Sequence, residues 1–250
     1  MIDFFSNFDF LILIYIWPII VFSAIFRSFT GFGFALAAVP SFSLFLSPIE
    51  SVVLVSLLTL LVNILFLKNY IHDVPVKPLI PLLLMAFIGT IIGVEIIKVI
   101  SKEWFQFFVG LSVIFACLSM FIFKPNKHVE MPKLAWPVGF FSGVMNGSLA
   151  LPGPPVIIYA LNTQQTPEKS RSLLAAFFFI SAIFALISYY FNGFVSVDSL
   201  GFLLVSAPAM IIGDKLGFYL FRRYGGEFYR KIAILFLAII GISMLTTILK

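Results

Sequence analysis

The chain has 250 residues, of which 61% are hydrophobic and only 11% are charged, and its mean hydropathy is +1.12. So little charge excludes a soluble domain of this length and predicts an all-α polytopic membrane protein. The net charge of +5 comes from basic residues scattered through short loops, so it does not indicate nucleic-acid binding. One cysteine and two distant histidines give no support for a disulfide framework, a metal site or a cofactor.

Long apolar runs follow one another along the chain, separated by short polar segments. Most approach the ~20 residues that a helix needs to cross a bilayer, but 34–46 and 154–163 are too short to cross alone. We therefore expect each half to contain a broken helical hairpin, which enters the membrane and returns, followed by three transmembrane helices. The predicted helices are 10–26, 34–46, 50–67, 78–100, 104–123, 134–149, 154–163, 172–192, 198–221 and 228–249.

Two of these stretches are interrupted by helix-breaking residues. The stretch Asn146–Tyr159 contains two glycines and three prolines, each of which weakens or breaks a helix. We expect Pro155 to open a new helix, because a proline at the first helical position loses no needed donor. The stretch Arg27–Pro40 is broken by Gly31 and Gly33. Matched interruptions in two halves of a membrane protein indicate the binding site of a transporter.

The two halves also share residues in the same order, at a nearly constant separation. This order predicts a first repeat at 1–125, a cytoplasmic linker at 126–133 and a second repeat at 134–250. An odd number of crossings in each repeat requires the second repeat to be inverted. The matches are Trp17-Pro18 with Trp136-Pro137, Gly33 with Gly153, Pro48 with Pro167, Gly93 with Gly213, and Ser119-Met120 with Ser243-Met244.

The placement of basic residues predicts the orientation. Most of the 16 lysines and arginines fall in four inter-helix loops, and placing these loops in the cytoplasm satisfies the positive-inside rule. The loops near Pro48, Ser101 and Asn192 then face outward, and both termini lie outside. This assignment agrees with the inverted repeat.

A helix that starts in mid-membrane presents free backbone N–H groups and a partial positive charge. Two such starts, near Phe34 and Pro155, would converge on one central point in an inverted repeat, and this geometry suits an anion. The alternative is that glycines and small residues merely allow close helix packing. The candidate substrate-binding residues are Arg27, Ser28, Thr30, Gly31, Phe32, Gly33, Asn146, Gly147, Ser148, Gly153, Pro154 and Pro155.

Arg27 is the charge whose position is hardest to explain by helix packing alone. It lies at the far end of the first apolar run, in a hairpin expected to stay at membrane depth. An ionisable residue there costs roughly 2.5–3.5 kcal/mol on insertion scales and usually faces a cavity or a partner. Two interpretations stay open: Arg27 binds the anion through a two-pronged hydrogen bond, or it snorkels to the far interface.

Three further polar residues are candidates for the pathway or its coupling. Glu95 lies one turn from Lys98, and Asp214 lies beside Lys215, each pair near a helix end. These acids could be gates or proton carriers, but we favour local ion pairs that help each helix end. Asn63 lies deep in a span, where it either bonds across helices or lines the path.

Three features of the sequence occur together: the second break at Asn146–Pro155, Thr30-Gly31-Phe32-Gly33 with the small-residue helix ending at Pro40, and the pairs Ile92-Gly93 and Ile212-Gly213. In these features the sequence resembles the sulfite exporter TauE/SafE family of bacterial membrane proteins. The resemblance covers the whole chain and implies transport of small organosulfur anions across the cytoplasmic membrane, in either direction. In that family the second break is usually glycine-rich, whereas prolines surround Gly153 here.

We therefore expect a secondary transporter that moves sulfite, or sulfonates such as sulfoacetate, by alternating access. The expected partners are a small anionic substrate and the lipid bilayer, and a homodimer is an open alternative to a monomer. A small-anion channel and a non-transporting scaffold or assembly subunit are the alternative functions. An enzyme is disfavoured, because the sequence has no cluster of His, Cys or paired carboxylates.

Overall fold

The computed structural model describes residues 11–30, 33–66, 74–122, 131–164, 166–224 and 226–246. In these ranges it is helical, with a short 3₁₀ turn (Pro132–Leu134) and no strand. The predicted helices are confirmed, and most of their ends differ from the expected ones by only one or two residues. The helices are α2 (Leu11–Thr30), α3 (Phe34–Phe42), α4 (Pro48–Phe66), α5 (Val76–Val99), α6 (Lys102–Ile122), α7 (Ala135–Leu149), α8 (Gly153–Thr163), α9 (Pro167–Phe191), α10 (Val197–Tyr224) and α11 (Gly226–Leu245).

Five of the described helices, α4, α5, α6, α9 and α10, are long and apolar enough to cross a membrane. Each corresponds to a transmembrane helix expected from the sequence, and none belongs to an expected hairpin. Their apolar windows are at most half buried within the protein, which leaves large hydrophobic side chains facing outward, as in a polytopic membrane protein. In α11, the sixth expected crossing, the described apolar part is the shorter segment Leu235–Leu245.

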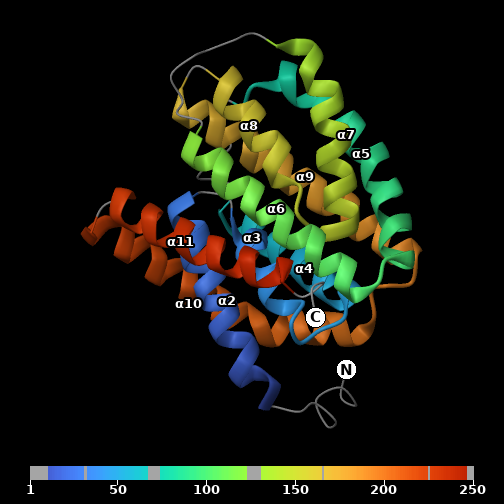
Figure 1. Cartoon of the computed structure of the whole chain (residues 1–250), viewed down its shortest axis with the longest axis vertical. Coiled ribbons are helices and arrows are strands. Elements are labelled where there is room, and N and C mark those ends of the chain that lie inside the picture. The colour runs from blue at the N-terminus through green and yellow to red at the C-terminus, as the bar shows by residue number, and fades with distance from the viewer. Residues whose placement is uncertain are drawn as a thin grey trace.

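The two halves of the chain contact each other through reciprocal helix pairs. α5 lies along α7 (Figure 1), and the corresponding helix of the second half, α10, packs along α2. In the same way, α5 packs on α9 and α10 on α4, and α6 packs on α8 and α11 on α3. Two further contacts, α4 with α9 and α6 with α11, join equivalent helices. Helices that the sequence analysis matched between the two halves thus make matched contacts.

Glycines let these helix pairs approach closely. A Cβ atom on Gly93 of α5 would collide with the backbone of Val144 in α7, and a Cβ on Gly213 of α10 would lie 2.6 Å from the carbonyl oxygen of Val21 in α2. Small residues at helix interfaces commonly serve this purpose in membrane proteins. The matched pair Gly93 and Gly213 therefore marks equivalent packing surfaces.

Candidate functional site

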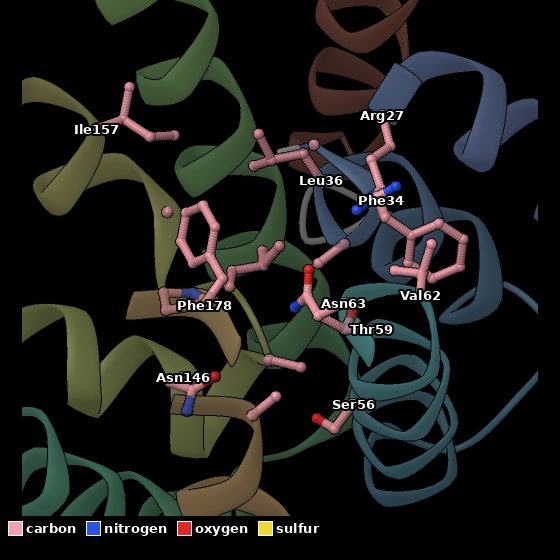
Figure 2. Close-up of a pocket in the computed structure, with 17 residues that line it drawn as sticks. Arg27, Phe34, Leu36, Ser56, Thr59, Val62, Asn63, Asn146, Ile157 and Phe178 are labelled. Carbon is pink, nitrogen blue, oxygen red and sulfur yellow. The ribbon is translucent and has the colours of Figure 1, made fainter. Parts of the chain in front are cut away.

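A cavity of about 50 Å³ lies between the two halves. α2, α3 and α4 line it from the first half, and the equivalent helices α7, α8 and α9 belong to the second (Figure 2). Both helix interruptions, at residues 33–36 and 150–153, are on its wall. A single water needs roughly 10–15 Å³ on this measure, so the cavity has room for about four water-sized groups.

The first interruption is a glycine turn between α2 and α3. Gly33 is the N-cap of α3 and has φ 143°, a conformation that glycine adopts without strain. Ala37 donates the first intrahelical hydrogen bond, to the carbonyl of Gly33 at 3.3 Å. The N–H groups of the residues between them have no acceptor within the helix, and Phe34, Ala35 and Leu36 line the cavity. The candidates Gly31 and Phe32, and the side chain of Thr30, lie outside the described residues.

The second interruption is a left-handed turn at Ala150. With φ 52°, Ala150 closes α7 through its N–H to the carbonyl of Asn146, 2.9 Å away. Glycine is the usual residue at such a left-handed position, so an alanine there is no sequence signal for a turn. α8 then begins at Gly153, two residues before the expected Pro155. The expectation was wrong because first-turn residues need no N–H, so both prolines fit inside the helix.

A polar stripe on α4 faces the cavity. Ser56, Thr59 and Asn63 are spaced so that they share one helix face, and all three line the cavity (Figure 2). Ser56 is a hydrogen-bond partner of the buried Tyr189 hydroxyl. Oγ1 of Thr59 and Nδ2 of Asn63 are buried and have no hydrogen-bond partner in the protein.

Arg27 reaches the same cavity from α2. It is only 5% exposed, and its Nη1 lies 3.0 Å from Oδ1 of Asp214 on α10. Ser28 donates to the same carboxylate oxygen at 3.1 Å. A side chain that is buried and paired in this way does not snorkel to the interface. The snorkelling interpretation of Arg27 was therefore wrong. The expected local pairing of Asp214 with Lys215 was also wrong, since the aspartate pairs with Arg27.

The model of the family described as Sulfite exporter TauE/SafE matches residues 16–244. The chain belongs to the TauE/SafE family. Comparison with curated proteins and with solved structures gave no match. This TauE/SafE protein is thus a multi-pass membrane transporter and not an enzyme, with a role in moving sulfite or a related anion.

The structure brings only part of the predicted site of this TauE/SafE protein to the cavity. Arg27, Gly33, Asn146 and Gly153 line it, together with the pathway candidate Asn63. The amide of Asn146 donates to the carbonyl of Ser181 at 2.8 Å.

The other described candidates lie elsewhere. Gly147 does not break α7 but lies inside it, where a Cβ would collide with the carbonyl of Thr90 on α5. Ser148 donates to the carbonyl of Val144 in its own helix. Pro154 and Pro155 are in the first turn of α8, outside the lining. Glu95 forms the favoured local ion pair with Lys98, at 2.6 Å.

Several lining residues of this TauE/SafE protein escaped the sequence analysis. Ser56 and Thr59 carried a usable signal, because with Asn63 they form a polar stripe at helical spacing in an apolar span. Phe178 and Ala182 on α9 carried none, since an apolar residue in an apolar helix is unremarkable there. Only the packing of α9 against the cavity shows that Phe178, one of 32 phenylalanines, lines it.

Proposed function

We propose that this TauE/SafE protein is a secondary transporter that binds a small organosulfur anion, sulfite or a sulfonate, in the cavity between its halves. The observation that carries this proposal is the pair of buried donors without partners, Oγ1 of Thr59 and Nδ2 of Asn63, on the wall of a cavity that Arg27 also lines. Buried polar groups are normally hydrogen-bonded, and an exception calls for an explanation. A bound oxyanion supplies the missing acceptors.

The backbone around the cavity also favours a negatively charged ligand. α3 and α8 both begin on its wall, and helix N-termini favour negatively charged groups. Arg27 adds a full positive charge, and arginine matches the oxygens of an oxyanion through its planar fork of donors. Asp214 forms an ion pair with this guanidinium. We assign Asp214 the role of a competing carboxylate: the anion must either share the guanidinium with it or displace it.

We further propose that the halves are inverted repeats that move against each other in alternating access. The reciprocal helix contacts and the matched residues of 1–125 and 134–250 support two equivalent halves. The loop charges support a cytoplasmic linker at 126–133 and both termini outside the cytoplasmic membrane. The anion would then bind near the midplane, where interrupted helices of inverted repeats meet.

Replacing Thr59 by valine tests the binding site at nearly constant side-chain shape. A hydrogen bond to a charged group contributes about 1.5–3 kcal/mol, so Thr59→Val should weaken sulfite binding about tenfold or more. Isothermal titration of the purified protein measures this. Thr90→Val is the matched control, because Thr90 also has a buried hydroxyl without a partner but faces α7, away from the cavity.

The outcome separates the proposed function from its alternatives. Both valine variants should keep or raise the melting temperature, because each removes a buried group with no partner. Only Thr59→Val should lose affinity. If Thr59→Val and the wild type bind sulfite with equal affinity, the cavity is not the binding site. Absence of saturable binding in the wild type would favour the non-transporting scaffold.

A further inference from the structure

The cavity is built from equivalent helices, but its two walls differ in chemistry. Counted from the first residues of α4 and α9, Thr59 and Phe178 hold equivalent positions, and so do Asn63 and Ala182. All four residues line the cavity. Figure 2 shows Thr59 and Asn63 on one side of it and the ring of Phe178 on the other. The repeat is therefore broken at the level of side chains.

The α4 wall carries hydrogen-bond donors that have no acceptor in the protein. Oγ1 of Thr59 and Nδ2 of Asn63 are buried without a partner. A buried donor keeps its full desolvation penalty until an acceptor reaches it. The oxygens of a sulfonate are such acceptors, and Arg27 lines the same part of the site from the first half of the chain.

The wall contributed by the second half suits an apolar group. Phe178, Ala182 and Ile157 line it, and Asn146 is the one polar side chain among the described lining residues of this half. Its amide Nδ2 is already bound to the carbonyl of Ser181. Away from the start of α8, a charged group against these apolar side chains would lose water without gaining a partner. An alkyl group would gain from leaving water.

We propose that the site takes an amphipathic anion with one sulfonate head on the α4 wall and a short alkyl tail against α9, whose length Phe178 limits. This rests on the proposed function and narrows it, because inorganic sulfite would occupy only the polar end. A volume of about 50 Å³, or roughly four to five water-sized groups, suits an anion close in size to methanesulfonate and leaves no room for a long tail. A tail with a second charge, as in sulfoacetate, meets the apolar wall and binds less well than an alkyl tail of similar size.

Calorimetric titration of the purified full-length protein tests this with sulfite, ethanesulfonate, butanesulfonate and sulfoacetate. The wild type should bind ethanesulfonate more tightly than sulfite, and butanesulfonate more weakly than ethanesulfonate. In Phe178→Ala, butanesulfonate should gain about tenfold in affinity, as expected for two methylenes that become buried. Sulfite, which has no tail, should gain least, and sulfoacetate should gain less than butanesulfonate.

Phe184→Ala is the matched control. Phe184 lies on the same helix, but its ring packs on Phe87 with centroids 5.2 Å apart, and it does not line the cavity. Its variant should keep the wild-type order of affinities. Phe178→Leu should give a smaller shift in the same direction, and it replaces Phe178→Ala if that variant fails to fold.

Three results would overturn the inference. If sulfite binds but tail length has no effect, or if Phe178→Ala changes all four affinities equally, the tail site is wrong and the proposed function stands. If no anion binds to a folded wild-type protein, the proposed function falls and the tail site falls with it.

Discussion

Arg27 and Asp214 form a buried ion pair that joins α2 to α10 at the cavity wall. The two residues are 5% and 7% exposed, and their charged atoms lie 3.0 Å apart. Removing one partner of a buried pair typically costs about 3–5 kcal/mol, whereas replacing both partners is often nearly neutral. Arg27 therefore stabilises the fold as well as supplying charge to the proposed site.

We predict that Arg27→Gln lowers both the melting temperature and sulfite binding, because it leaves the Asp214 carboxylate buried without its partner. Adding Asp214→Asn should restore most of the lost stability, since no unpaired charge then remains. It should not restore binding, because the cation is still missing. Thermal unfolding and calorimetric titration of both single variants and the double variant measure the two effects separately.

The exposed pair of Glu95 and Lys98 provides the control for this cycle. Neutralising both residues to glutamine should change neither stability nor binding noticeably, as is usual for an exposed ion pair. A stable Arg27→Gln, Asp214→Asn double variant that binds sulfite as tightly as the wild type would show that the buried pair is only structural.

Sequence reasoning identified some of the residues at the cavity and missed others for physical reasons. Arg27 and Asn63 were found because polar side chains are rare in apolar spans. The partner of Arg27 was missed because Asp214 is 187 residues away, and Lys215 is its neighbour in sequence. Phe178 was missed because its polar counterpart, Thr59, gives no hint of which residue faces the cavity from the other half.

At the scale of elements, α3 and α8 both begin at the cavity but differ in what their glycines tolerate. Gly33 has φ 143°, so a side chain there is strained whatever space surrounds it. Gly153 lies in the first turn of α8, and its φ is not positive. A Cβ there would lie 3.1 Å from Cδ1 of Ile157 and 3.9 Å from Cζ of Phe178.

We predict that Gly153→Ala weakens sulfite and sulfonate binding with little change in melting temperature, because a small shift of the Ile157 side chain admits the methyl group beside the cavity. Gly33→Ala should lose both stability and binding. Gly147→Ala is the packing control and should lower the melting temperature, because its Cβ would collide with the carbonyl of Thr90. If Gly153→Ala binds as tightly as the wild type, the start of α8 does not contact the anion.

The helices themselves could be predicted well from the sequence, because uninterrupted apolar runs of membrane length leave little choice of structure. The conformation of the turn before α8 could not be predicted in this way. The predicted helix 134–149 ends where α7 does, but the left-handed conformation of the residue that follows it, Ala150, was not foreseen. Its conformation depends on surrounding structure that holds an unfavourable backbone angle, and no local sequence rule includes that contribution.

At the scale of the whole molecule, the helices of the two halves pack in reciprocal pairs. The contact of α5 with α7 mirrors that of α10 with α2. The order of matched residues along the chain predicted that the two halves correspond, and this made the meeting of both interruptions at one cavity predictable. The difference in chemistry between the α4 and α9 walls was not predictable, because it depends on which face of each helix points into the cavity.

We predict that the loop at Pro48 is outside and the start of α9 at Glu168 is inside. Single cysteines at these positions, in a Cys117→Ala background, should react with a membrane-impermeant thiol reagent from opposite sides of sealed vesicles. Cys117 is buried in the protein, so its removal should not disturb either loop. Labelling of both positions from the same side would exclude inverted repeats.

Counterflow of labelled sulfite and of labelled ethanesulfonate in proteoliposomes tests whether the protein transports these anions by alternating access. An alternating-access transporter with a site between its halves should accumulate each label transiently when the lumen holds the same unlabelled anion. Thr59→Val should reduce this counterflow, and Thr90→Val should not. Flux of either label without trans-acceleration would show a channel, and absence of any flux beyond protein-free vesicles would contradict transport of these anions.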